Sequence, residues 1–382
     1  MSTNPEYLPE TPEELTATWL GAALNAPISQ IEQRALGEGK GFMGDVLRLS
    51  LRSEGPEVPA SVVAKIPKKA NRAVGELMGV YEREIMFFRT LGQDMPIRIP
   101  QMLFSEFDRD KGSENQEAIL RGFDKMPLFL HGAIGAFGAW VAAAKKRRYL
   151  LIIEDLASMR AADQLQGLDE DGCVKVLEAI APMHRQFWGA EALQGHFWLL
   201  PLDVDARLRH VRFRQSREQF GQVMGSGLAE TLDWLMDNGE RLTRQFVADT
   251  PATLAHCDLR MDNVMFDEGD RCAFIDWQLV RRAPAAWDVA YFICGALHSD
   301  QDAACVERIL RRYHKALSVP DYSFDDLQRD YQRALLLHVA NLASAGDGDI
   351  DFGNERGSTM MATWMQRLAA RATEVGLPND IG

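Results

Sequence analysis

The chain has 382 residues, of which 46% are hydrophobic and 25% are charged, so it is long enough to form two domains with packed cores. Its formal net charge of −13 argues against a general nucleic-acid binder, because such a protein needs a basic face to meet phosphates. Five cysteines, an odd number without a C-x-x-C pair, argue against a zinc site or a disulfide framework and indicate a reducing, cytoplasmic compartment.

The first predicted element is a helix near the N-terminus. Thr11 can cap it, with proline at the next position and glutamate at the third, and we expect the helix to run to about Leu24. The residues before Thr11 lack a positively charged region followed by an apolar run, so no signal peptide is expected.

A glycine-rich run follows, inside a region of strands and loops that spans residues 31–66. Its glycines include Gly37, Gly39, Gly41 and Gly44. Glycines let backbone N–H groups approach phosphates closely, although such runs also make plain hairpin turns. The run precedes an apolar strand over 62–66 that carries one lysine, Lys65. This lysine is either a site residue or a solvent-facing residue at a strand end.

A helix over 76–91 and strands over 100–107 and 149–153 complete the predicted N-terminal half. The segment of about 110–148 is long for a simple connection and reads as an insertion, either a lid or a variable surface piece. Within it, residues 127–144 carry little charge and come near the length of a membrane-spanning helix. Proline, histidine and several glycines there favour a buried or amphipathic insertion over stable membrane insertion.

The second half of the chain is predominantly helical. Apolar periodicity predicts helices over 172–188, 228–247, 302–317, 331–342 and 359–375. His184, in the first of these, is expected to be a packed or hydrogen-bonding structural residue. Asp347, Asp349 and Asp351 alternate like the start of a calcium loop, but Phe352 replaces the required glycine, so a solvated loop is the better interpretation.

The most informative stretch is His256-Cys257-Asp258-Leu259-Arg260-Met261-Asp262-Asn263, followed by Phe274-Ile275-Asp276-Trp277. Strands over 264–267 and 272–275, joined by a Glu-Gly-Asp turn, predict a hairpin that returns Asp276 to the side of Asn263. Phosphoryl transfer needs a carboxylate that orients the attacking hydroxyl and oxygen ligands for magnesium. Asp258 suits the first task, and Asn263 and Asp276 suit the second.

These motifs resemble the aminoglycoside phosphotransferase and choline kinase superfamily. His-Cys-Asp, Asn-Val-Met-Phe, Phe-Ile-Asp-Trp-Gln and the later Trp-Asp-Val-Ala-Tyr-Phe are closest to its ecdysteroid-kinase-like branch. The resemblance implies an α+β, bilobal, protein-kinase-like fold that uses ATP and Mg²⁺. Residues 1–155 would form a nucleotide-binding lobe with an antiparallel sheet and a helix. Residues 156–382 would form a larger, mainly helical lobe with the catalytic loop and the acceptor site.

The resemblance also assigns roles to individual residues. Lys65 would pair with the ATP phosphates and be held by a helix glutamate, Glu84 in preference to Glu82 or Glu76. The glycine-run backbone would cover the phosphates. The backbone around Glu154 and Leu156 would bind adenine, with a helix cap as the competing role for Asp155. His256 and Asp288 would support the catalytic loop without reacting.

Two alternatives and several unknowns accompany this hypothesis. A protein kinase fits less well, because Cys257 replaces the Arg of His-Arg-Asp, Trp-Gln follows Asp276 in place of Phe-Gly, and no Ala-Pro-Glu segment follows. A catalytically silent nucleotide-binding protein on the same fold is the second alternative. The expected partner is a small-molecule hydroxyl acceptor. Its identity (apolar or steroid-like, aminoglycoside, choline or sugar), the use of GTP, and the oligomeric state stay open.

Overall fold

The chain folds into two compact units. The computed structural model describes residues 7–36, 44–53, 58–69, 71–109, 113–127, 129–132, 147–189, 191–224, 226–345 and 355–378. The first unit comprises Met1–Met95, Ile99–Glu114 and Met126–Ser158, and the second comprises Pro96–Arg98, Asn115–Lys125 and Met159–Gly382. Part of the predicted insertion, Asn115–Lys125, therefore groups with the second unit, although the chain on either side of it belongs to the first.

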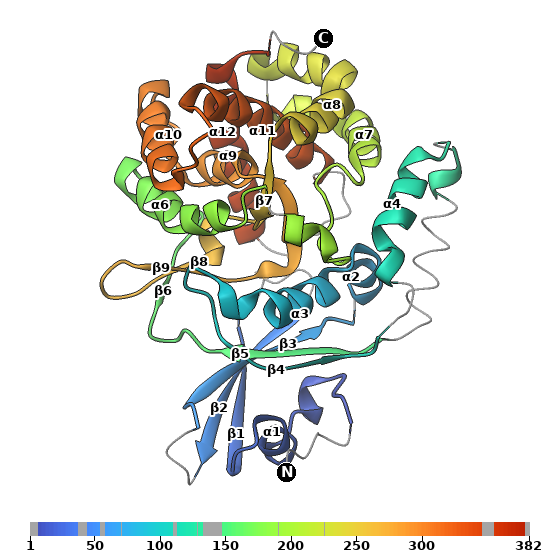
Figure 1. The fold of residues 1–382 in the computed structure, drawn as a ribbon, viewed down its shortest axis with the longest axis vertical. Helices are drawn as coiled ribbons and strands as arrows, with labels where there is room; N and C mark the ends of the chain where they lie inside the picture. Colours follow the sequence, from blue (N-terminus) through green and yellow to red (C-terminus); the bar gives the residue numbers. More distant parts are fainter. Residues whose placement is uncertain are drawn as a thin grey trace. The chain divides into compact units, whose positions relative to one another are not determined.

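The first unit is built on a five-stranded antiparallel sheet in the order β1-β2-β3-β5-β4 (Figure 1). Its strands are β1 (Ile28–Ala35), β2 (Gly44–Ser53), β3 (Ser61–Pro67), β4 (Met102–Phe107) and β5 (Tyr149–Glu154). The helix α1 (Ala17–Leu24) buries Trp19 and Leu20 in one core with sheet residues such as Leu49 and Ile152. This burial of apolar area is what stabilises the packing of α1 on the sheet.

The first helix begins later than predicted. Pro12–Glu14 form only a 3₁₀ turn, η1, and Thr11 makes no capping hydrogen bond. Leu15 is fully buried and leaves the helical region at ψ 76°, which ends the turn. Thr16 then caps α1, because its side chain accepts a hydrogen bond from the backbone N–H of Trp19 at 3.2 Å.

The helix predicted over 76–91 is two helices, α2 (Arg72–Met78) and α3 (Val80–Thr90). Gly79 separates them at φ +68°, in the left-handed region that glycine adopts without a steric penalty. The break leaves Met78, the last residue of α2, exposed. It also lets α3 bury charged residues such as Glu84 beside Phe88.

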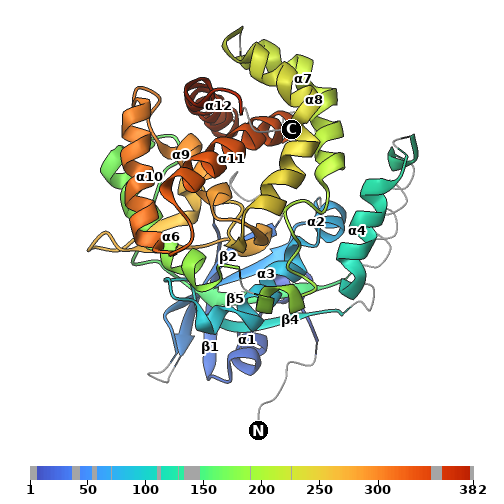
Figure 2. The same cartoon turned by 45° about the horizontal axis from the view of Figure 1, so that its top comes forward.

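The second unit is mainly helical, so the predicted α+β class is confirmed. Its helices are α4 (Gln116–Lys125), α6 (Glu170–Gln186), α7 (Ala206–Met224), α8 (Ala229–Asp249), α9 (Ala286–Ala296), α10 (Ala303–Leu317), α11 (Phe324–Ala345) and α12 (Glu355–Val375). Five of them correspond to the predicted helices with shifted ends. Figure 2 shows α7 and α8 side by side, with α11 packed against both and α10 packed against α6.

Two small sheets lie among these helices. They comprise β7 (Ala252–Ala255) with β10 (Arg281–Pro284), and β6 (Arg160–Ala161), β8 (Val264–Phe266) and β9 (Cys272–Phe274). The short 3₁₀ turns beyond η1 are η2 (Gly92–Asp94), η3 (Ser113–Asn115), η4 (Glu191–Gly195), η5 (Ser226–Leu228), η6 (Met261–Asn263) and η7 (Trp277–Leu279). The antiparallel hairpin β8–β9 confirms the predicted return of the chain after Asn263.

The helix α7 was not predicted. Its sequence contains five arginines and few apolar residues, so the apolar stripe that would reveal a helix is weak. Its stability comes from packing against α8 and α11 and from side-chain contacts described below.

Parts of two predictions fall outside the described residues. These are most of the apolar segment 127–144 and the whole aspartate loop at 347–351. Among the helices that are described, none is long and apolar enough to cross a membrane.

Candidate functional site

The site in the second unit is formed by the loop between β7 and β8 and by the end of the β8–β9 hairpin. In this hairpin Val264 pairs with Phe274, and the backbone N–H of Ile275 donates to the carbonyl oxygen of Asn263 at 3.0 Å. Asp276, the next residue, therefore lies beside Asn263. Because both the loop and the hairpin are short, local chain geometry is enough to bring Asp258, Asn263 and Asp276 together.

Asn263 contacts Asp258 in a way that fixes the orientation of its amide. Its Nδ2 donates to the backbone carbonyl of Asp258 at 2.9 Å and to Oδ2 of the Asp258 carboxylate at 3.0 Å. Both partners are acceptors, so the nitrogen must face them and Oδ1 must point elsewhere. Oδ1 accepts no hydrogen bond from the described part of the chain. A buried, oriented carbonyl oxygen of this kind is available as a metal ligand.

The backbone of the loop is held in an unusual conformation. Cys257 and Asp276 adopt φ angles of +61° and +67°, which non-glycine residues rarely take. Such conformations persist when the surrounding structure determines them and are common at functional sites. Here the Asp288 carboxylate accepts from the backbone N–H groups of His256 at 2.6 Å and Cys257 at 2.8 Å.

Asp288 and the two histidines around it form a fully buried polar cluster that supports the loop. His184 Nε2 lies 3.2 Å from the Asp288 carboxylate, and its Nδ1 lies 2.8 Å from the Tyr313 hydroxyl. His256 Nε2 donates to the carbonyl oxygen of Ile275 at 3.0 Å, which ties the loop to the hairpin. Burial alone would raise the pKa of Asp288, but the hydrogen bond and positive charge of His184 outweigh it and hold that pKa below its usual range. The cluster is a support, as expected for Asp288, His184 and His256.

The sequence analysis missed three side chains that contact this loop. The Tyr291 hydroxyl, from α9, donates to Oδ1 of Asp258 at 3.2 Å. Arg260 places Nε 3.5 Å from Oδ2 of the same carboxylate. Gln164, which is 1% exposed, accepts from the Met261 N–H at 2.8 Å and donates to the Gly295 carbonyl at 2.7 Å. Tyr291 stands three residues after Asp288 in the Trp-Asp-Val-Ala-Tyr-Phe motif, so the motif was a usable signal; nothing in the sequence pointed to Gln164.

These contacts set the electrostatics of Asp258. Burial raises the pKa of its carboxyl above the usual range; the positive charge of Arg260 opposes the shift and the negative charge of Asp276 adds to it. Burial also keeps the Tyr291 hydroxyl protonated by raising its pKa, so this hydroxyl acts as a donor to Asp258. A positioned carboxylate with a raised pKa is suited to accepting a proton from a hydroxyl.

The first unit holds the remaining predicted site residues. Lys65 on β3 and Glu84 on α3 form an ion pair at 2.6 Å, with 18% and 8% of their side chains exposed. Glu82 pairs instead with Arg147 at 2.8 Å, so the partner of Lys65 is Glu84. A largely buried lysine–glutamate pair of this kind holds the ammonium group at one place on the sheet.

The other predicted nucleotide-binding positions are partly described. Gly37, Gly39 and Gly41 lie outside the described residues. Gly44 starts β2, where an added Cβ would lie 3.1 Å from the carbonyl oxygen of Ile66.

The predicted adenine segment lies at the end of β5. Glu154 is bound through its backbone N–H and its carboxylate to Gln101, and Leu156 is buried. Asp155 caps no helix; its carboxylate binds Arg48 at 2.7 Å and Ser61 at 2.5 Å.

The residues present fit a magnesium ion that is completed by other ligands. No cluster of three or more histidine, cysteine or acidic side chains is placed to hold a metal in the described residues. The Asn263 Oδ1 and the Asp276 carboxylate are hard oxygen donors, which Mg²⁺ prefers, and Mg²⁺ is commonly held by one or two protein ligands plus substrate phosphates and water. Two protein ligands, Asn263 and Asp276, are therefore enough for a magnesium site of this kind.

Comparison with known proteins places these residues in a family context. The sequence profile of a family described as "Phosphotransferase enzyme family" matches residues 135–327, just over half of the chain, including the catalytic loop and the hairpin. No curated protein shows significant similarity to the chain.

Several solved structures are similar at low identity. A choline kinase from Cryptosporidium parvum is 12% identical over 88% of each chain, with a TM-score of 0.49. An ethanolamine kinase from Plasmodium vivax is 13% identical over 87% of this chain and 81% of that chain, with a TM-score of 0.48. A macrolide 2′-phosphotransferase from Brachybacterium faecium is 13% identical over 90% and 96%, with a TM-score of 0.45. Likeness at this level does not specify an acceptor.

Proposed function

Because the chain belongs to the phosphotransferase enzyme family, we propose that it transfers the γ-phosphoryl group of ATP to a hydroxyl of a small molecule. The observation that carries the proposal is the arrangement of Asp258 and Asn263. One amide donates to the candidate base through Nδ2 and leaves its carbonyl oxygen for a metal. One short loop thus provides both a base and a metal ligand, as phosphoryl transfer requires.

Asp258 is the group that handles the acceptor. Its Oδ1 receives one hydrogen bond, from Tyr291, and retains a lone pair for the hydroxyl of the acceptor. The carboxylate orients this hydroxyl toward the γ-phosphorus and takes its proton as the P–O bond forms and ADP leaves. Since the transition state is loose in most analyses, orientation contributes more than early deprotonation.

Asn263 and Asp276 would hold Mg²⁺, which neutralises charge on the phosphates when bound. Lys65 is the donor-side cation, and its pair with Glu84 keeps the ammonium in place. The backbone near Glu154 and Leu156 and the glycine run complete the proposed nucleotide site. Cysteine usage supports a cytoplasmic location, and the ecdysteroid-kinase-like motifs favour acceptors with an apolar or steroid-like body.

The test is a screen of magnesium-dependent ADP or GDP release over a library of hydroxylated compounds, with Asp258→Ala and Asp276→Ala as variants. We expect turnover with one chemical class. Asp258→Ala should lose this turnover and still bind Mg·ATP, whereas Asp276→Ala should weaken the magnesium-dependent binding itself. Nucleotide binding without transfer to any acceptor would favour a silent binding protein. The absence of nucleotide binding by the wild type, or near-normal turnover in both variants, would contradict the proposal.

A further inference from the structure

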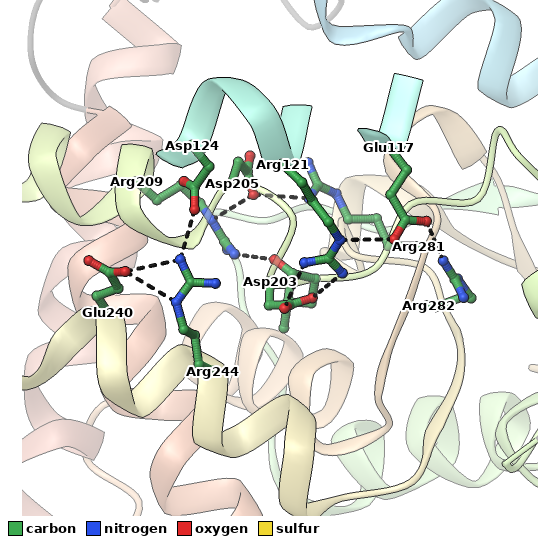
Figure 3. A network of polar contacts seen from close by, with 11 residues as sticks. Glu117, Arg121, Asp124, Asp203, Asp205, Arg209, Glu240, Arg244, Arg281 and Arg282 are labelled. Atoms are coloured by element: carbon green, nitrogen blue, oxygen red, sulfur yellow. Dashed lines mark hydrogen bonds and ion pairs between the residues drawn. The ribbon is translucent and has the colours of Figure 1, made fainter. Parts of the chain in front are cut away.

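A network of arginines and carboxylates joins α4, α7, α8 and β10 within the second unit (Figure 3). On the α4 side each carboxylate has an arginine partner. These pairs are Asp203 with Arg121 at 3.2 Å, Asp124 with Arg244 at 2.8 Å and Glu117 with Arg282 at 2.7 Å. The pairs account for the attachment of α4 to the unit.

The pairing is uneven at the end of the network that comes from α7 and β10. Arg209 Nε and Arg281 Nη1 lie 3.1 Å and 3.3 Å from the same oxygen, Oδ1 of Asp205. Asp203 adds some negative charge near Arg209, but Arg121 binds both of its carboxylate oxygens, so Asp203 makes no ion pair with the second guanidinium. Asp205 also immediately precedes the N-terminus of α7, which adds further positive potential. Although the whole network is balanced, this end carries an excess of positive charge.

This end of the network lies next to the candidate base in the chain. Arg281 pairs with Ala255 in the β10–β7 ladder, and Ala255 stands three residues before Asp258. Three residues span at most about 10 Å. Arg209 and Arg281 are also both close enough to Cys257, the residue before Asp258, to interact with it electrostatically.

Arg281 keeps unused binding capacity. The side chains of Arg209 and Arg281 are 23% and 17% exposed, so neither arginine is fully enclosed by the protein. Among the described residues, the Arg281 side chain donates one hydrogen bond, to Asp205, out of the five N–H donors of a guanidinium. Its neighbour Arg282 is a contrast, because its guanidinium binds both the Leu199 carbonyl and Glu117. The planar fork of arginine matches the paired oxygens of a carboxylate or phosphate.

We propose that Arg281, backed by Arg209, forms an anion-binding subsite for the acceptor, and that the acceptor is a hydroxylated molecule bearing a carboxylate or phosphate group. The inference rests on the proposed function, which places the acceptor hydroxyl at Asp258. An anionic acceptor is not what the net charge of −13 would suggest, but the acceptor meets the local positive charge of its subsite and not the charge of the whole chain. Amino alcohols and polycationic sugars would meet two guanidinium groups and be disfavoured.

The test compares matched probes on the full-length protein. These are ω-hydroxyalkanoic acids, their primary amides, the corresponding ω-amino alcohols and hydroxyalkyl phosphates. Binding is measured by calorimetry in the presence of Mg²⁺ and a non-hydrolysable ATP analogue, and turnover is measured as ADP release. We expect the wild type to prefer an anionic probe over its matched amide by at least about tenfold, the range of one desolvated charge-assisted pair. The acid and phosphate arms decide which anion is preferred.

The variants are Arg281→Gln, which removes the charge, Arg281→Lys, which keeps it, and Arg312→Gln as a control on an exposed arginine of α10. Arg281→Gln should abolish the preference for the anionic probe and leave binding of the amide unchanged. Arg281→Lys should retain part of the preference, and Arg312→Gln all of it. If Arg281→Gln weakens the binding of all probes equally, Arg281 acts on the transferred phosphoryl group or in folding, and the proposed subsite is overturned.

The wild type alone also provides a test, in case the Arg281 variants do not fold. Preference for amides or amino alcohols, or binding of no anionic probe, would overturn the proposal. Failure of the proposed function looks different, because anionic probes would bind and no phosphoryl group would be transferred. Transfer to neutral or cationic alcohols with no anionic preference would leave the function standing and remove the subsite.

Discussion

Replacing Asp288 by asparagine tests whether the catalytic loop depends on one buried carboxylate. Asp288 is fully buried and accepts hydrogen bonds from the backbone N–H groups of His256 and Cys257. The imidazole of His184 contacts the same carboxylate oxygen as the His256 N–H. Asparagine has nearly the same shape but only one acceptor oxygen. One of the two backbone N–H groups must then face an NH₂ group.

The magnitude follows from these contacts. A hydrogen bond to a charged group contributes about 1.5–3 kcal/mol, and a buried donor left without a partner costs about 1–3 kcal/mol. Losing one charge-assisted bond and leaving one donor unpaired should together lower the free energy of unfolding by about 2.5–6 kcal/mol. Because Cys257 adopts a left-handed conformation that these bonds maintain, the loop should also shift. A displacement of about 1 Å would lower turnover on the order of 100-fold.

The assay is urea unfolding followed by tryptophan fluorescence, with turnover measured on the folded variant. Asp321→Asn is the control, because Asp321 is exposed and its substitution should change the free energy of unfolding by less than about 0.5 kcal/mol. If Asp288→Asn unfolds within about 1 kcal/mol of the wild type and keeps normal turnover, the loop does not depend on Asp288 and the reasoning is wrong.

Two further predictions concern other buried residues of the second unit. Gln164→Leu leaves the buried Met261 N–H without its partner, whereas the Gly295 carbonyl keeps its hydrogen bond from Arg367. The substitution should therefore cost roughly 1–3 kcal/mol and lower kcat more than it raises KM for ATP; equal effects on both would refute the positioning role. Burial lowers the pKa of His338 from 6.5 to about 4. As the pH falls, this histidine is therefore protonated in the unfolded chain before it is protonated in the folded protein. The stabilisation contributed by neutral His338 is full above pH 6.5 and lost by pH 4. Between pH 7 and pH 5 the wild type should lose about 2 kcal/mol that His338→Gln does not lose, and an identical pH slope in both proteins would show that His338 does not titrate this way.

The sequence by itself determined the parts of the site that are local in the chain. Asp258 and Asn263 share a loop of a few residues, and the hairpin after it has a clear turn and alternating strands, so chain geometry alone returns Asp276 to Asn263. Most of the helices of the second unit followed from apolar periodicity, and the α+β class followed from the resemblance of the motifs to a known superfamily. Boundaries were less accurate where one residue decided them, as Thr16 does for α1 and Gly79 does between α2 and α3.

Tertiary structure alone decided which distant residues meet. Nothing local distinguishes Glu84 from Glu82 as the partner of Lys65, because the choice depends on the rotation of α3 and on Arg147, which occupies Glu82 from the far end of the insertion. Gln164 reaches Met261 across 97 positions of sequence. The sequence also did not reveal the positive charge next to the candidate base. Although the chain is acidic, Arg209 and Arg281 meet at one carboxylate because α7 and β10 pack together. Contacts of this range are set by packing, and packing is a property of the whole fold.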